Sequence, residues 1–117
     1  TIYKALEDLT MGELREEIII DLTVSKDQLN ESFLRQMGTA IELLLKRMFG
    51  LNNLGFKVRG TRSSVRDFAA TVSQESSYMR ALQQHGLADP STFRSKADLD
   101  KAVSKFETST GIKWPLK

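Results

Sequence analysis

The sequence predicts a mainly α protein: a small bundle of about four helices with one short extended basic segment that allows minor β pairing. Three observations support this fold class. Apolar residues recur three or four positions apart over several stretches, as on one face of a helix. Glycines and capping-box patterns mark the ends of these stretches. The 117 residues, 40% hydrophobic and 27% charged, suit one domain over residues 1–117 with a single core.

Residues 1–50 are predicted to form a helical hairpin. From Thr10 to Leu22 apolar residues fall at helical spacing, with Thr10 as the cap. A strand competes over residues 18–24, because apolar residues rich in β-branching also alternate there. We favour the helix, since a Glu-rich stretch leads directly into it.

The second helix of this hairpin is predicted between Ser25 and Gly50. Ser25 and Gln28 have capping-box spacing, and Gly50 is placed to end the helix. The apolar stripe is long enough to form the spine of the domain. Its members are Leu29, Phe33, Met37, Ala40, Ile41, Leu44, Leu45 and Met48.

Residues 51–60 are predicted as a turn followed by a short extended segment. Residues 56–59 alternate apolar and basic side chains, as a strand does. One strand is not stable alone, so it needs a partner. That partner is either residues 18–24 or the same segment of a second subunit.

Residues 61–117 are predicted to hold the C-terminal helices. One helix runs from residue 61 or 63 to residue 85, with Gly86 at its end. An Asp89-Pro90 pair starts a short turn of helix. A second capping-box pattern at Ser95 opens a last helix, which ends near Gly111.

Charge is unevenly distributed, although the formal net charge is only +2. Residues 1–22 hold two basic and six acidic residues, whereas residues 51–66 hold four basic residues and no acid. The acidic arm can therefore pack on the basic segment of the same or a neighbouring chain. Equally, the basic segment can meet an external anion.

The basic segment is the one place where residue types point to a partner. Its cations are Lys57, Arg59, Arg62 and Arg66. They span a strand, a turn with hydroxyl side chains and a helix N-terminus, a combination that favours phosphate. The sequence therefore predicts a nucleic-acid site that contacts the backbone. Side chains that would extend it are Arg80, Arg94 and Lys96. A solvated strand edge and pairing with the acidic arm are the alternatives.

Three aromatic residues have two interpretations each. Phe56 and Tyr78 either pack in the core or stack on bases beside the arginines. Trp114 either caps the bundle or, if exposed between lysines, anchors a protein interface.

The chain shows no arrangement typical of an enzyme. His85 is the only histidine, and with Asp89 nearby it favours a structural role. The P-loop spacing is missing, and the lack of cysteine excludes thiolate metal sites and disulfides. We therefore expect no cofactor and no metal. No apolar run is long enough to cross a bilayer, so we expect a cytoplasmic location and no membrane partner.

Several stretches of the C-terminal half carry a family resemblance: Val58 to Thr61, Tyr78-Met79, His85 to Leu87, Ala97 to Val103 and Thr110 to Pro115. In these stretches the chain resembles small helical accessory proteins of T4-type bacteriophages, such as the one encoded beside the phage recombination helicase. The resemblance implies a helical bundle that associates with nucleic acid in phage replication or recombination, in the host cytoplasm.

The leading prediction is thus a small non-enzymatic accessory protein that binds nucleic acid through the basic segment. The alternative is a protein–protein interaction or assembly module, either a homo-oligomer or a phage structural component. Such a module would use the apolar helix faces, the acidic arm and the tail around Trp114.

Overall fold

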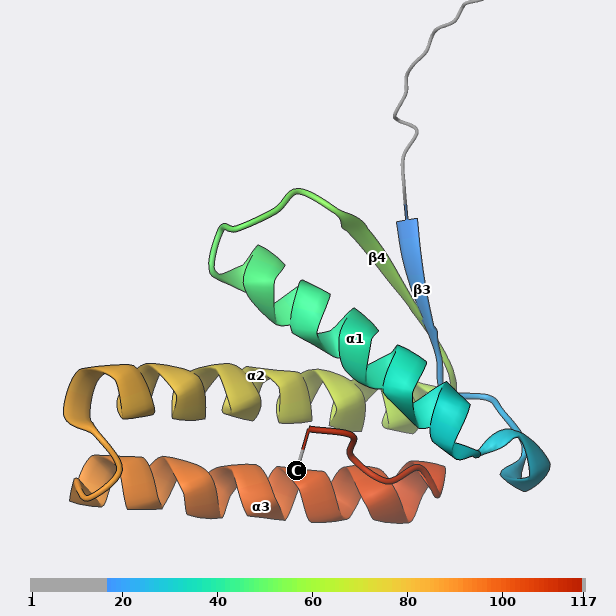
Figure 1. Cartoon of the computed structure of the whole chain (residues 1–117). Coiled ribbons are helices and arrows are strands. Elements are labelled where there is room, and N and C mark those ends of the chain that lie inside the picture. Colours follow the sequence, from blue (N-terminus) through green and yellow to red (C-terminus); the bar gives the residue numbers. More distant parts are fainter. Residues whose placement is uncertain (1–16, 117) are drawn as a thin grey trace, which may run out of the picture.

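The computed structural model describes residues 17–116. Its elements, in order, are β3 (Glu17–Asp21), the 3-10 turn η1 (Lys26–Gln28), α1 (Glu31–Met48), β4 (Gly55–Arg59), α2 (Arg62–His85) and α3 (Pro90–Thr110). Figure 1 shows α2 and α3 as an antiparallel hairpin, with α1 crossing over α2 and the two strands beside α1. The protein is therefore mainly helical, as predicted, but the described residues form three helices instead of about four.

β3 and β4 form a two-stranded parallel sheet, in which Ile18 lies beside Phe56 and Ile20 beside Val58. A parallel pair requires a crossover connection, which α1 provides. The helix predicted over residues 10–22 is therefore wrong for residues 17–21, and residues 10–16 lie outside the described part. The strand forms because β4 supplies backbone partners to a β-branched run that also alternates. Strand and helix, and not two helices, thus make up the described part of the N-terminal half.

The long central helix begins five residues later than the capping box at Ser25 predicts. The Ser25 amide donates to Gln28 Oε1 at 3.2 Å, but this arrangement closes only the short turn η1. A second cap then starts α1: the Asn30 side chain accepts from the Phe33 amide at 2.8 Å. The Asn30 cap fixes the helix start because it satisfies an amide that η1 leaves free.

Both remaining helices begin at side-chain caps and end at glycines. Thr61 caps α2, and the predicted end of this helix at Gly86 is confirmed. Asp89 caps α3 by accepting from the Ser91 amide at 2.8 Å, and one continuous helix then runs to Gly111. The predicted helix start at Ser95 is wrong, because the Asp89 cap with proline at the next position already starts the helix.

The core lies between α1, the α2–α3 hairpin, the sheet and the C-terminal tail. An aromatic cluster at its centre joins Phe68 of α2, Phe106 of α3 and Trp114 of the tail, with ring centroids 5.3–6.1 Å apart. From α1, the side chains that reach this core are Met37, Ile41 and Leu45. The C-terminal tail thereby ties α1 to the α2–α3 hairpin, and Pro115 packs 3.5 Å from the Cβ position of Gly38.

Candidate nucleic-acid interface

The strand half of the candidate site is the outer face of β4. Phe56 and Val58 are half-buried and pack against the core. Because side chains alternate along a strand, Lys57 and Arg59 project on the opposite face, and both are exposed. Two cations therefore lie two residues apart on the open face of the sheet.

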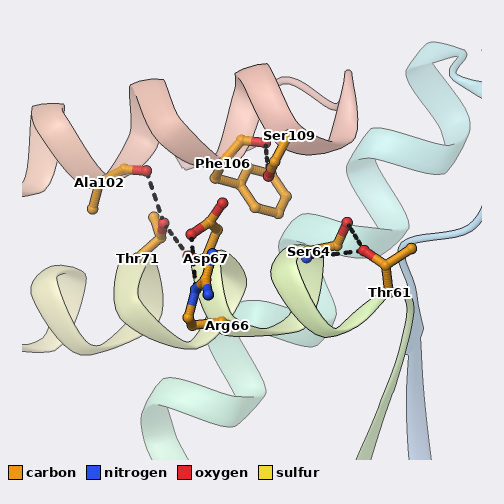
Figure 2. Close-up of polar contacts among 8 residues, drawn as sticks. All are labelled: Thr61, Ser64, Arg66, Asp67, Thr71, Ala102, Phe106 and Ser109. Carbon is orange, nitrogen blue, oxygen red and sulfur yellow. Dashed lines mark hydrogen bonds and ion pairs between the residues drawn. The ribbon is translucent and has the colours of Figure 1, made fainter.

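The helix half of the site is the first turn of α2. Thr61 Oγ1 accepts from the Ser64 amide at 3.1 Å and donates to Ser64 Oγ at 2.9 Å (Figure 2). This first turn contains no acidic residue. Arg62 and Arg66 are one helical turn apart, and both are exposed. Since cations are disfavoured at the positive end of a helix dipole, an anion bound there would lower the electrostatic energy.

Contacts with α3 hold the opposite face of α2. Thr71 is fully buried, and its Oγ1 donates to the carbonyl of Asp67 at 2.7 Å and to the carbonyl of Ala102, across the helix pair, at 3.1 Å (Figure 2). The Asp67 carboxylate is buried and lies 3.8 Å from Nε of the exposed Arg66. This ion pair therefore joins the face of α2 that packs on α3 to the face that is open to solvent. This packing fixes the rotation of α2, so that its two N-terminal arginines face solvent.

Two acids of β3 share the outer sheet face with the basic strand. The register places Asp21 beside Arg59 and Glu17 beside Gly55. Hydrogen bonds from the side chain and then the amide of Thr23 lower the pKa of Asp21, and the Arg59 charge adds to this against the opposing effect of burial. Asp21 therefore stays ionised at neutral pH and partly balances Arg59. Sequence reasoning favoured a helix for these acids, but it also named residues 18–24 as a possible partner of the basic strand, and the register confirms that alternative for β3.

The predicted extensions of the site lie elsewhere on the hairpin. Arg80 stands eighteen positions along α2 from Arg62, about 27 Å by helix geometry, and its guanidinium lies 5.1 Å from the Phe49 ring centroid. Lys96 donates to Asp100 at 2.7 Å, and this bond raises the pKa of Lys96. Arg94 is exposed near the start of α3, in the half of the hairpin remote from the sheet. The four residues of the basic segment therefore lie on two consecutive elements, β4 and the start of α2, whereas these three lie farther along the hairpin.

Aromatic side chains are not available beside the basic segment. Phe56 packs on the core face of β4, and Tyr78 is half-buried against the core. Trp114 is 3% exposed, and its Nε1 donates to Glu75 Oε1 at 2.9 Å. The interpretation of Trp114 as an exposed interface anchor is therefore wrong: the indole completes the core, because the chain folds back after Gly111 and a buried carboxylate receives its N–H.

His85 is the last residue of α2 and is exposed. Its charge, together with that of Arg94, contributes to the lowered pKa of Asp89, whose main cause is the hydrogen bond from the Ser91 amide. Among residues 17–116 no group of three or more His, Cys, Asp or Glu side chains could hold a metal ion.

A separate feature, which sequence reasoning did not find, is an open apolar groove between the C-terminal halves of α1 and α2. Its volume is about 830 Å³. Leu45, Phe49 and Leu51 line it from the α1 side, and Met79 and Leu82 line it from α2. Because the groove combines residues about thirty positions apart, only the packing of α1 across α2 creates it.

Comparisons with protein-family models, curated proteins and solved structures found no match for this chain. The resemblance to phage accessory proteins therefore stays a prediction. Within the part of the chain that the structure describes, no helix is both long and apolar enough to cross a membrane.

Proposed function

We propose that this protein is a non-enzymatic accessory protein that binds nucleic acid through backbone phosphates. The binding residues in this proposal are Lys57, Arg59, Arg62 and Arg66. The observation that carries it is the start of α2, where Arg62 in an acid-free first turn and Arg66 one turn later, 3.8 Å from Asp67, are both exposed near the positive end of the helix dipole. A role in phage replication or recombination rests on the family resemblance alone.

The surroundings of the site favour electrostatic contact over base reading. Stacking on bases needs exposed aromatic rings, and Phe56 faces the core instead. Contacts with phosphates position a protein on nucleic acid without reading its sequence. We therefore expect weak sequence preference and strong dependence on salt.

Because Asp21 lies beside Arg59, the proposal makes two distinct predictions for the salt dependence of binding. If all four cations neutralise duplex phosphates, log affinity falls with log salt at a slope of about −3.6. If Arg59 stays paired with Asp21, only three cations contact phosphates and the slope is about −2.7. Replacing Asp21→Asn should then tighten binding and steepen the slope, because it frees Arg59.

The test is fluorescence anisotropy of labelled single-stranded and duplex DNA and RNA over a salt series. Arg62→Glu/Arg66→Glu should abolish binding. Lys101→Glu/Lys105→Glu is the matched control, since it makes the same charge change at exposed positions on α3. No binding by the wild type at low salt, or equal losses in both variants, would contradict the proposal.

A second candidate function is a protein-interaction module, and the apolar groove favours it. Monomeric proteins rarely leave large contiguous apolar surfaces in water. Exposed apolar side chains that line the groove include Leu51, at 70% exposure, and Met79, at 38%. Neither residue belongs to the basic segment, so the two candidate functions use different surfaces.

A further inference from the structure

The apolar groove between α1 and α2 is an open binding surface for an apolar group. Its walls are side chains of two helices, and Leu51 stands at its edge largely in water. Charged side chains at its border are Glu42 and Lys46, so the rim carries both signs. A groove with an apolar floor and a mixed rim suits an apolar protrusion that also carries both signs.

The same molecule has such a protrusion at the tip of its hairpin, the residues 86–93 that join α2 to α3. Leu87 and Phe93 are 68% and 62% exposed. Asp89 and Arg94 lie beside them, which gives the tip one acid and one base. Tip and rim therefore each combine apolar side chains with one acid and one base, so that each charge of the tip can meet an opposite charge of the rim.

Tip and groove also open on the same side of the hairpin. Phe93 lies about four helical turns before Glu107 and therefore on the same face of α3. The Glu107 carboxylate accepts from the Trp114 amide at 2.9 Å, so this face of α3 is the one on which the tail packs. The tail also packs on α1, where Pro115 lies 3.5 Å from the Cβ position of Gly38, so Phe93 faces the side of the hairpin on which α1 lies. Leu87 is only four positions from Gln83, a groove residue.

We propose that a second copy of this chain occupies the groove, with each hairpin tip inserted into the partner's groove about a two-fold axis. When a protrusion and a recess lie side by side on one surface, two copies related by a two-fold axis fill each other's recesses, and the assembly is closed. A protrusion and a recess on opposite ends would instead build an open chain of copies. This arrangement deepens the protein-interaction candidate and does not depend on nucleic-acid binding.

The two-fold pair leaves the basic segments free. The groove uses the C-terminal half of α2, whereas Arg62 and Arg66 stand at its N-terminus. One dimer would thus carry two separate basic segments. Two linked segments raise the apparent affinity for a long nucleic acid without any new contact.

The test is sedimentation velocity on the full chain from low micromolar to about 1 mM. The tip variant is Leu87→Ser/Phe93→Ser and the groove variant is Leu51→Ser/Met79→Ser. Ile19→Ser is the control, since it removes an exposed apolar side chain from the outer face of β3, away from both surfaces. All five positions are exposed, so circular dichroism should show the wild-type fold in every variant.

We expect the wild type and the control to dimerise, and the tip and groove variants each to raise the dimer dissociation constant by about tenfold or more. A mixture of the tip and groove variants should associate more tightly than either alone, because a mixed pair keeps one intact tip–groove contact. A wild type that stays monomeric at every concentration would overturn the proposal and leave the groove to another segment or protein. So would a dimer that only Ile19→Ser weakens.

Discussion

Replacing Trp114→Phe removes the only indole of the chain and the hydrogen bond that it makes in the core. The bond joins Nε1 to Glu75 Oε1 at 2.9 Å, and Glu75 is 8% exposed. The ring also packs edge-on against Phe106, with centroids 5.3 Å apart. The substitution therefore tests whether the tail holds the hairpin together through this contact.

The expected loss has two parts. Leaving the buried Glu75 carboxyl oxygen without its donor costs about 2 kcal/mol. The smaller phenyl ring leaves a void of roughly two methyl groups, at about 1 kcal/mol each. The free energy of unfolding should thus fall by about 4 kcal/mol, a large share of the 5–15 kcal/mol typical of a domain.

Urea denaturation followed by far-UV circular dichroism measures this loss, since the variant has no tryptophan to report by fluorescence. A double-mutant cycle with Glu75→Ala separates the hydrogen bond from the void. The coupling free energy between the two positions should be about 2 kcal/mol. The double variant should consequently lose less stability than the sum of the two single variants.

The cycle also defines what would refute this reasoning. A coupling below about 0.5 kcal/mol, within the error of additivity, would mean that the indole and the carboxylate do not interact. A total loss below about 1 kcal/mol for Trp114→Phe would mean that the ring is not part of the core. An unchanged dependence on urea is required for either conclusion, because it shows that the same surface is exposed on unfolding.

Three further predictions concern single positions. Gly38→Ala should raise the free energy of unfolding by up to about 1 kcal/mol in urea melts, since it favours helix and the new Cβ meets Pro115 at an ordinary 3.5 Å; a loss of stability would contradict this packing. Thr71→Val should lower that free energy by about 1 kcal/mol by removing the bond from α2 to α3, and no change would show the bond to be absent. Hydrogen bonds from Thr23 lower the folded-state pKa of Asp21, so its stabilising contribution is full above the unfolded pKa near 4 and is lost as pH falls through the lower folded pKa. In thermal melts over this acidic range, the melting temperature of the Asp21→Asn variant should therefore fall less steeply with pH than that of the wild type. Equal pH dependence in the two proteins would refute this prediction.

Local signals in the sequence were sufficient for the elements that stabilise themselves. The start of α2 near residue 61 and its end at Gly86 are as predicted, because cap and helix hydrogen bonds join residues only a few positions apart. The predicted apolar stripe also contains the buried side chains of α1, which are Met37, Ile41 and Leu45, but its last member, Met48, is 42% exposed. The start of α3 was misplaced because two cap patterns, at Asp89 and Ser95, stood in one helix and only the first is used.

The basic segment is the part of the candidate site that sequence by itself determined. Lys57, Arg59, Arg62 and Arg66 are adjacent along the chain, so a short strand and a helix start suffice to hold them together. Their exposure follows from the alternation and the helix period, both of which the sequence contains.

Only the tertiary structure decided the rest. Residues 17–21 satisfy both the helical and the strand pattern, and the choice depends on partners in β4, 38 positions away, whose backbone groups a helix would not use. The same pairing sets Asp21 beside Arg59 and so reduces the charge of the site. The burial of Trp114 and the groove between α1 and α2 likewise depend on how distant elements pack. Local sequence patterns do not predict such contacts, because their free energy comes from surfaces that meet only after the chain has folded.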